Sequence, residues 1–413
     1  MRLGAREGPG ASLAEFYRRE APDRLGVAVS GGSDSLALLH LLHDWAGAAL
    51  FVATVDHRLR PGSAGEAAHV AALCEGLGLP HTVLEWTGWD GKGNLQDQAR
   101  RTRYSLLADW ATEHGLQAVA LGHTRDDVAE TFLMRLSRGA GVDGLSAMAG
   151  RFTRGEMTFH RPLLHLDRET LRQSLTDRGV AWVDDPSNDD IAFDRVKARQ
   201  ALSHLGDLGL DAETLAKVAG NMAEARAALG QTAAEWVSKT ATSVAGDLIF
   251  DRTALNQRPA ELRRRILAGA LRWVASSDYP PRRVPLADAE AAIAEVRNTT
   301  LHGCRLMVSD MTVRITREYA AVAGAEAGGD GRWDTRWRIE GPHDASVSVR
   351  ALGEALNHCP DWRETRLPRA TLLASPAIWR DEELIAAPVA GFSNGWSATS
   401  QGLEDFAASL ISH

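Results

Sequence analysis

The chain has 413 residues, of which 44% are apolar and 24% charged, and its formal net charge is −8. At about 100–200 residues per domain, this length predicts more than one domain, each able to bury a core without disulfides or metals. The composition excludes collagen-like, disordered and disulfide-stapled classes, and the negative charge does not by itself indicate a nucleic-acid-binding protein.

The cysteines and the apolar segments indicate the cellular compartment of the protein. Cys74, Cys304 and Cys359 are scattered and form no CxxC pair. This is typical of reduced thiols in the cytoplasm and counts against a structural zinc site. The most apolar region, residues 36–55, is interrupted by two histidines and an aspartate, so it is not a membrane span. The N-terminus lacks the apolar core of a signal peptide, and we expect a cytoplasmic protein.

The first 190 residues alternate between two kinds of pattern. Short apolar runs predict strands at Leu25–Val29, Leu50–Val55, His81–Glu85, Ala118–Leu121 and Val180–Val183. Helical patterns lie at 35–46, 63–78, 94–114, 126–138 and 167–179. Strands that alternate with helices of this length predict βαβ units and a parallel sheet. We therefore expect an α/β domain over residues 1–205.

Polar or glycine-rich clusters follow four of the five predicted strands. These clusters are Ser30–Ser35, Asp56-His57, Gly122-His123 and Asp184–Asn188. In an open parallel sheet, ligands bind beyond the carboxyl ends of the strands. The four clusters are therefore expected to form one site.

The pattern changes after about residue 205. Residues 206–322 are predicted to form a mainly helical domain, in which alternation over Thr300–Arg317 indicates a hairpin. A Gly/Ala-rich linker follows at 323–331, and residues 332–413 mix short strand-like runs with Trp and Pro, which predicts a small mixed α/β domain. The expected domains are thus 1–205, 206–322 and 332–413.

The second of these domains contains a basic run. Residues 250–320 hold 12 arginines against 8 acidic residues, and Arg263, Arg264 and Arg265 are consecutive. Such a run is either a solvated helix face or an electrostatic footprint for an RNA backbone. The sequence leaves both interpretations open.

The strongest single motif is Ser30-Gly31-Gly32-Ser33-Asp34-Ser35, between an apolar strand and an apolar helix. Its glycines allow the backbone to approach a ligand closely, and its hydroxyls and the helix N–H groups suit a phosphate. Asp34 would repel phosphate unless a cation such as Mg²⁺ bridged the two. The motif lacks the lysine of a Walker A loop.

This loop resembles that of the PP-loop ATP pyrophosphatases, which cleave ATP between the α- and β-phosphates. Further segments, in order, resemble the bacterial tRNA(Ile)-lysidine synthases within that group. They are Val55–Arg60 with Ser63 and Glu66, Asn94–Gln96 with Arg100 and Arg103-Tyr104, Gly122–Asp127 with Glu130, Arg161–Leu164, Asp185–Asn188, and Arg195 with Arg199. Weaker matches occur at Thr300–Cys304 and Pro360–Arg363. One departure is Val196, where the family usually has Asn.

The resemblance implies a Rossmann-like PP-loop domain and an activity. With ATP and Mg²⁺ as cofactors, the enzyme would join L-lysine to C2 of cytidine 34 in the CAU anticodon of an isoleucine tRNA. The reaction would pass through an adenylated tRNA and release AMP and pyrophosphate.

The same resemblance, with the chemistry of the residues, assigns site roles. Asp34, Asp126 and Asp127 are expected to be catalytic, and Asp34 is also expected to be a Mg²⁺ ligand. The ATP site is expected to comprise Ser30, Gly31, Gly32, Ser33, Asp34, Ser35, Asp56 and His57. The lysine site is expected to comprise Asp127, Glu130, Arg195 and Arg199. The residues expected to contact tRNA are Arg100, Arg263, Arg264 and Arg265.

Several alternatives remain open at this stage. His123, Asp127 and Glu130 are spaced to share a helix face, where acidic residues can also merely complement the helix dipole. A zinc site there is disfavoured because thiolates are absent. His57 can cap its strand instead of lining the ATP pocket, and Arg195 and Arg199 can be a solvated face.

Alternatives for the whole protein are another PP-loop tRNA-modifying enzyme, such as a cytidine thiolase, and a nucleotide-binding module without catalysis. The absence of a CxxC pair disfavours the thiolase, and the intact aspartates disfavour the module. A homodimer is possible, and the sequence does not decide which carboxylate is the general base.

Overall fold

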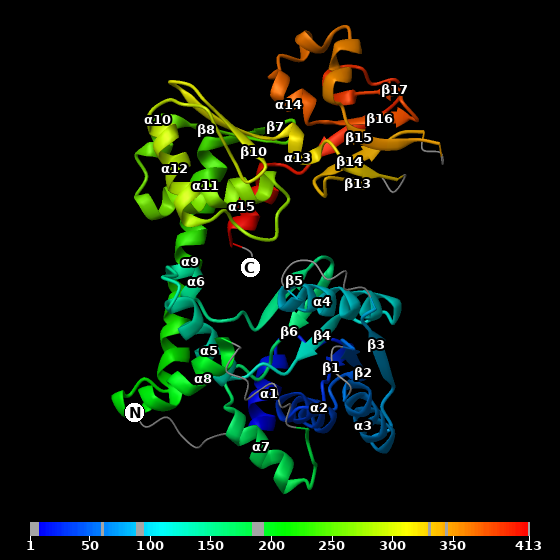
Figure 1. The fold of residues 1–413 in the computed structure, drawn as a ribbon, viewed down its shortest axis with the longest axis vertical. Coiled ribbons are helices and arrows are strands. Elements are labelled where there is room, and N and C mark those ends of the chain that lie inside the picture. The colour runs from blue at the N-terminus through cyan, green and yellow to red at the C-terminus, as the bar shows by residue number, and fades with distance from the viewer. Residues whose placement is uncertain are drawn as a thin grey trace. The chain divides into compact units, whose positions relative to one another are not determined.

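The computed structural model describes residues 8–58, 62–87, 95–183, 194–328, 332–342 and 346–411. By its internal contacts the chain divides into two compact units, residues 1–226 and 227–412 (Figure 1). None of the helices in the described ranges combines the length and the apolar character that a bilayer span requires.

The first unit is an α/β domain built on a six-stranded sheet of order β3-β2-β1-β4-β6-β5. The strands are β1 (Arg24–Ala28), β2 (Ala49–Asp56), β3 (His81–Glu85), β4 (Ala118–Leu121), β5 (Arg151–Arg154) and β6 (Met157–His160). All neighbours pair in parallel except the edge hairpin of β5 and β6. The parallel α/β fold predicted from the sequence is thereby confirmed.

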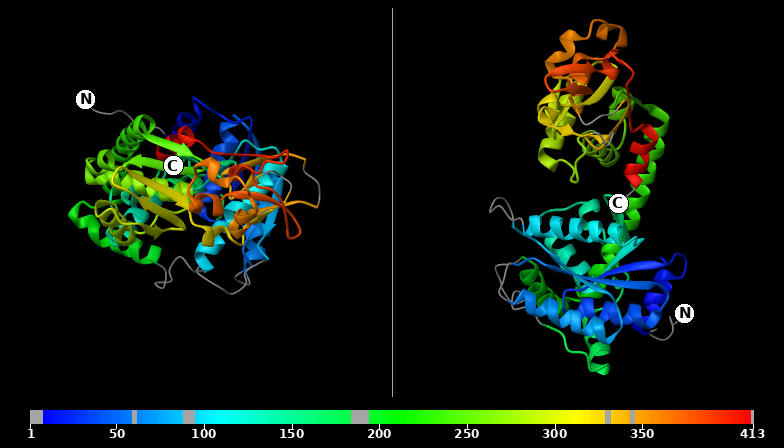
Figure 2. Two further views of the ribbon diagram at one scale, coloured as in Figure 1. Left: turned by 90° about the horizontal axis from the view of Figure 1, so that it is seen from above. Right: turned by 90° about the vertical axis from the view of Figure 1, so that its right-hand side faces the viewer.

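The helices of this unit cover both faces of the sheet (Figure 2). They are α1 (Pro9–Tyr17), α2 (Ser33–Trp45), α3 (Ser63–Gly76), α4 (Leu95–Glu113), α5 (Arg125–Leu136), α6 (Val142–Leu145), α7 (Arg168–Asp177) and α8 (Asp194–Leu205). A 3-10 turn at Gly206–Leu208 follows α8, and the long helix α9 (Ala212–Thr240) continues into the second unit.

Alternate strand residues pack on opposite faces, as a pleated strand requires. Val27 and Ala120 belong to the core under α1, α2, α3 and α7, whereas Ala28 and Leu121 belong to the core under α4. A third cluster packs Val128 and Phe132 of α5 against the first part of α9.

One predicted strand is wrong. Residues 180–183 form no strand, and the sheet is instead extended by β6, which pairs with β4. Helix α7 ends at Asp177, just before this segment. The Val183 N–H then donates to the Gly31 carbonyl at 3.0 Å. The apolar run at 180–183 therefore packs beside the phosphate loop rather than in the sheet.

The described residues of the second unit form three antiparallel sheets. The largest, of order β7-β8-β11-β10-β9, comprises β7 (Ala241–Val244), β8 (Asp247–Asp251), β9 (Thr299–Leu301), β10 (Cys304–Val308) and β11 (Thr312–Arg317). Its helices are α10 (Arg252–Asn256), α11 (Ala260–Val274), α12 (Arg283–Ala294) and α13 (Tyr319–Val322). The predicted hairpin over Thr300–Arg317 is confirmed by the pairing of β10 with β11.

The rest of the described part of this unit forms two smaller sheets and two helices. The sheets are β12 (Glu326–Ala327), β15 (Ser348–Ala351), β16 (Pro376–Arg380) and β17 (Glu383–Ala386), and β13 (Arg332–Trp333), β14 (Trp337–Glu340) and β18 (Ser397–Ser400). The helices are α14 (Arg369–Leu373) and α15 (Leu403–Ile411), with 3-10 turns at Gly353–His358, Trp362–Thr365 and Pro388–Ala390. Phe406 of α15 packs in the core of α11 and the five-stranded sheet.

Candidate functional site

The loop Ser30–Ser35 joins β1 to α2 and is shaped by its own hydrogen bonds. The Ser35 hydroxyl accepts the backbone N–H of Ser30 at 3.1 Å and donates to the Gly32 carbonyl at 2.9 Å. Gly31 has a φ of +85°, which L side chains rarely adopt. Because α2 begins at Ser33, the N–H groups of its first turn lack helical acceptors and suit a phosphate.

The end of β4 packs directly against this loop. A Cβ placed on Gly122 would lie 2.9 Å from the carbonyl oxygen of Asp34 and 3.0 Å from the Cα of Ser35. Both atoms belong to the backbone, so neither can rotate away. Glycine at position 122 is therefore what allows the β4–α5 turn to approach the phosphate loop.

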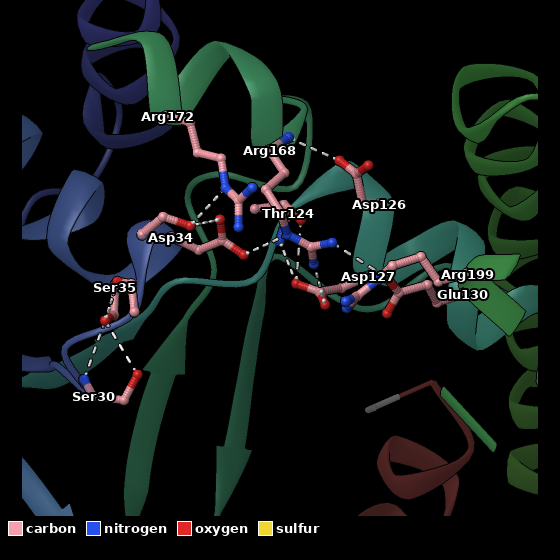
Figure 3. Close-up of polar contacts among 12 residues, drawn as sticks. Ser30, Asp34, Ser35, Thr124, Asp126, Asp127, Glu130, Arg168, Arg172 and Arg199 are labelled. Carbon is pink, nitrogen blue, oxygen red and sulfur yellow. Dashed lines mark hydrogen bonds and ion pairs between the residues drawn. The ribbon is translucent and has the colours of Figure 1, made fainter. Parts of the chain in front are cut away.

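The carboxylates of α5 lie on the other side of that turn (Figure 3). The Asp127 carboxylate accepts the backbone N–H of Thr124 at 2.8 Å and so caps the helix. Burial opposes its ionisation, but the charge of Arg195 and the Thr124 N–H hold the pKa of Asp127 below its ordinary value. The Asp126 carboxylate accepts the backbone N–H of Arg168 at 2.8 Å.

Arg168, which the sequence analysis did not single out, joins these carboxylates to the phosphate loop (Figure 3). Its Nε donates to Asp34 at 3.1 Å, and its two terminal nitrogens lie 3.4 Å from Glu130 and from Asp127. An arginine in the first turn of a helix opposes the helix dipole. An arginine in the first turn of the helix predicted at 167–179 is electrostatically unfavourable, and this was the feature of the sequence that could have indicated a role for Arg168 in the site.

Glu130 is the most buried carboxylate of the site, with 1% of its side chain exposed. It pairs with Arg195 at 3.2 Å and with Arg199 at 3.0 Å, in addition to Arg168. Its oxygens therefore face three guanidinium groups, two of them from α8. The expected role of Glu130 in binding lysine stays a prediction.

Asp34 stands between the loop and this charge cluster. Burial and the neighbouring charge of Asp127 raise the pKa of Asp34, while its ion pair with Arg168 lowers it. No group of three or more His, Cys, Asp or Glu side chains able to hold a metal occurs among the described residues. Mg²⁺ is usually held by one or two carboxylates and by substrate phosphates, and Asp34 beside a phosphate loop fits that pattern.

Asp56 is the last residue of β2 and His57 follows it; β2 pairs in parallel with β1. The backbone N–H of Arg58 donates to Asp56 at 2.8 Å. Burial works against the Asp56 carboxylate, but hydrogen bonds from Ser63 and Arg58 give it a lowered pKa. The rings of His57 and Trp86 are nearly perpendicular, with centroids 5.6 Å apart. Burial lowers the pKa of His57 and so favours its neutral form. Both residues therefore lie at the carboxyl end of β2, next to the carboxyl end of β1, from which the loop starts.

His123 precedes α5, so the expectation that it lies on one helix face with Asp127 and Glu130 is wrong. Burial lowers the pKa of His123 to about 3, against the attraction of Asp127. Among the described residues, its Nδ1 is buried without a hydrogen-bond partner. The ring is therefore a buried, neutral polar group, and the charges of Arg161 and Arg103 also disfavour its protonation.

Arginines gather around Tyr104 on α4. The Arg100 guanidinium is exposed and lies 5.5 Å from the ring centroid, and Arg161 donates to the Tyr104 hydroxyl at 3.5 Å. Burial and the charges of Arg100 and Arg161 lower the pKa of Arg135. This concentration of like charge is suited to a polyanion.

Arg263, Arg264 and Arg265 lie on α11 in the second unit and are paired with carboxylates. Arg263 contacts Glu290 at 3.0 Å, and the other two contact Glu261 at 3.2 and 3.5 Å. The side chain of Arg265 is only 8% exposed, whereas those of Arg263 and Arg264 are each 26% exposed. The expected tRNA contact of Arg265 therefore finds no support in the structure, because the amphipathic helix turns this position towards the protein.

Some residues of the expected site cannot be placed. The cluster Asp184–Asn188, the residue Asn94, and Leu59 with Arg60 lie outside the described residues. The departure at Val196 is described: its side chain is buried in α8, between the positions of Arg195 and Arg199.

Comparison with known proteins gives a consistent result. A family model described as a PP-loop domain matches residues 9–205. The tRNA(Ile)-lysidine synthase of Ruegeria pomeroyi is 48% identical over 411 residues, which are 97% of each chain. Those of a Bradyrhizobium species and of Hyphomonas neptunium are 39% and 38% identical, covering 70% and 72% of this chain and 84% of each relative.

Proposed function

This chain belongs to the tRNA(Ile)-lysidine synthases, which are PP-loop enzymes, and we propose that its site activates a tRNA cytidine with ATP and then joins lysine to it. The substrate is cytidine 34 in the CAU anticodon of an isoleucine tRNA, and the products are lysidine, AMP and pyrophosphate. We assign the reaction to the cytoplasm, where tRNA and ATP are available.

The observation that carries the proposal is the position of Arg168. One guanidinium contacts Asp34 of the phosphate loop and also Asp127 and Glu130 of α5. The phosphate loop and the carboxylates therefore form one site, which can accept an anion at one end and a cation at the other. A nucleoside triphosphate and an amino acid with an ammonium side chain have this charge pattern.

In the first step, the loop holds the phosphates of ATP with its N–H groups and with the hydroxyls of Ser30, Ser33 and Ser35. The C2 oxygen of the cytidine attacks the α-phosphorus, and pyrophosphate leaves. Asp34 would hold Mg²⁺, which supplies charge neutralisation for the phosphates when bound. Asp56 and His57, at the neighbouring strand end, complete the nucleotide site.

In the second step, the side-chain amine of lysine attacks C2 of the activated cytidine, and AMP leaves. The ammonium must first lose a proton, and a carboxylate of α5 accepts it. Asp126 is better suited as this base than Asp127, because capping and Arg195 favour the ionised, weakly basic form of Asp127. Arg195 and Arg199, oriented by Glu130, bind the carboxylate of lysine.

The tRNA backbone is assigned to the arginines around Tyr104, including Arg100, and to the more exposed members of the α11 run, Arg263 and Arg264. Backbone contacts position an RNA, whereas a base is read only after it leaves its stack. Burial lowers the pKa of both His57 and His123, and we assign contacts with the unstacked base to these two rings.

The proposal is tested by incubating the protein with ATP, Mg²⁺, radiolabelled lysine and total tRNA. Label is expected in one isoleucine tRNA, with one AMP and one pyrophosphate formed for each lysine. A methionine tRNA with the same CAU anticodon is the matched control and should remain unlabelled. ATP cleavage without transfer of lysine, or transfer of sulfur instead, would overturn the proposal.

A further inference from the structure

We propose that Arg168 is a displaceable counter-charge, which holds the carboxylates of the site together between turnovers and gives up its place when the cations of the reaction bind. The inference rests on the proposed function for the identity of those cations. It concerns a positioning residue and not a group that reacts.

The first support is the spread of its contacts. Three different nitrogens of one guanidinium face three different carboxylates, at 3.1, 3.4 and 3.4 Å. Nearby structural pairs are shorter, such as Arg125 with Asp167 at 2.8 Å and Arg138 with Asp194 at 2.7 Å. Arg168 is therefore shared among its partners and forms no close, two-pronged pair with any one of them, so a competing cation can replace it stepwise.

The second support is that the backbone of Arg168 is fixed independently of its side chain. Its N–H donates to Asp126 at 2.8 Å, and Asp167 caps the same helix by accepting the Thr170 N–H at 2.7 Å. The start of α7 therefore stays in place when the guanidinium moves. The side chain is 18% exposed, so it retains a route to solvent.

The third support is the charge balance. Asp34, Asp126, Asp127 and Glu130 lie within the reach of one residue, and Asp127 already disfavours ionisation of Asp34. Without Arg168, these carboxylates would repel one another in a partly buried site. A divalent cation at Asp34 and an ammonium at the α5 carboxylates would satisfy the same oxygens that Arg168 now satisfies.

The test is metal binding in the absence of nucleotide, with Mn²⁺ as the probe and paramagnetic resonance as the readout. Arg168→Met removes the charge and keeps most of the side-chain length, and it should bind Mn²⁺ at least tenfold more tightly than the parent. Arg168→Lys keeps the charge and should stay within about threefold of the parent. Arg178→Met is the matched control, because Arg178 caps the other end of the same helix and pairs with the exposed Asp44.

Unchanged or weaker Mn²⁺ binding by Arg168→Met would overturn the inference. If that variant does not fold, the parent decides the question through the proton-exchange rate of the Arg168 Nε–H group, measured by NMR. This measurement uses diamagnetic Mg²⁺ in place of Mn²⁺. The exchange rate should rise when Mg²⁺ and a non-hydrolysable ATP analogue are added to the protein, and an unchanged rate overturns the inference.

The proposed function and this inference can fail separately. Lysine transfer to tRNA by the parent tests the function and does not depend on where the Arg168 guanidinium lies before the substrates bind. Tighter Mn²⁺ binding by Arg168→Met without any lysine transfer by the parent would retain the counter-charge and reject the synthase activity. Lysine transfer by the parent together with unchanged Mn²⁺ binding by Arg168→Met would retain the synthase activity and reject the counter-charge.

Discussion

Single residues of the site show how burial and paired charge set protonation. Burial raises the pKa of Asp34 and lowers that of His123, so each is driven towards its neutral form. Asp127 departs from this trend because a backbone N–H and Arg195 stabilise its charge. Asp34 and Asp127 therefore differ in pKa although they lie close together. Asp34 is suited to accept a cation, and Asp127 is suited to cap a helix.

Replacing Asp34 should separate chemistry from folding. In Asp34→Asn, tRNA-dependent release of pyrophosphate should fall at least a hundredfold, because an amide cannot neutralise a cation bound to the phosphates. The unfolding free energy should change by no more than about 1 kcal/mol, since the side chain is partly exposed and outside the apolar core. Pyrophosphate assays and urea unfolding measure the two effects. Near-normal release would mean that the loop does not bind phosphate in this way.

His160 predicts a dependence of stability on pH. Burial lowers the pKa of His160 to about 4, and its Nδ1 lies 3.3 Å from the Tyr17 hydroxyl. The unfolded chain takes up this proton below about pH 6.5, whereas the folded protein does not until near its lowered pKa. The contribution of His160 is therefore complete above pH 6.5 and is lost as the pH falls towards 4.

The variant His160→Phe should flatten this dependence. Between pH 7 and pH 5, its unfolding free energy should fall by about 2 kcal/mol less than that of the parent. Urea unfolding at several pH values measures the difference. Parallel curves for parent and variant would show that the ring is protonated in the folded protein.

At the scale of elements, the site is the meeting point of three helix N-termini. Helices α2, α5 and α7 each begin at the same end of the sheet, and Arg168 of α7 contacts residues of the other two. Their dipoles favour a bound anion, and the acidic residues of their first turns favour a cation. The order of strands β1, β4 and β6 brings these ends together, although long stretches of chain separate them.

This packing depends on the absence of a side chain at position 122. In Gly122→Ala, the new methyl group would meet the backbone of Asp34 at 2.9 Å and push the phosphate loop away from α5. ATP affinity should fall at least tenfold, and the unfolding free energy should fall by about 1–3 kcal/mol.

Gly76→Ala is the matched control for this substitution, since Gly76 ends α3 and a Cβ there meets nothing within 4 Å. It should leave ATP affinity unchanged and be neutral or slightly stabilising. Equal effects of the two substitutions on nucleotide binding, measured by calorimetry, would refute the role of Gly122.

At the scale of the whole molecule, the internal contacts divide the chain into two compact units at residue 226, beyond the predicted boundary at 205, which stays a prediction. The reason is apolar packing between α5 and the start of α9. Leu215 and Ala219 of α9 are 5% and 1% exposed and cover Val128 and Phe132. The helix that carries Asp126, Asp127 and Glu130 is therefore covered by residues that lie beyond the last motif of the domain.

A chain that ends after Arg226 should fold and bind ATP, whereas one that ends after Leu205 should be less stable by several kcal/mol. Losing the cover of two buried side chains on α5 costs about 2–5 kcal/mol in typical cores. Thermal unfolding and nucleotide titration of the two truncated chains measure this. Equal melting temperatures would show that α9 contributes nothing to the first unit. By the proposed assignment of RNA contacts, both fragments should bind tRNA more weakly than the full chain.

The order of motifs in the sequence determined the family resemblance, the parallel sheet and the phosphate loop. These features depend on short segments, where a strand, a glycine pair and a helix start are adjacent in the chain. The local pattern was insufficient where a short apolar run could be either a strand or a packed loop. This is why 180–183 was expected in the sheet and β6 was not.

Only the tertiary structure decided which charges meet. Arg168 and Asp34 are separated by 134 positions, and Arg199 and Glu130 by 69, so no local spacing pairs them. The same holds for Arg265, whose burial depends on the core packed under α11. A guanidinium or a carboxylate has the same appearance in a sequence whether it is solvated or paired, because its role depends on burial and on partners that folding brings within about 4 Å.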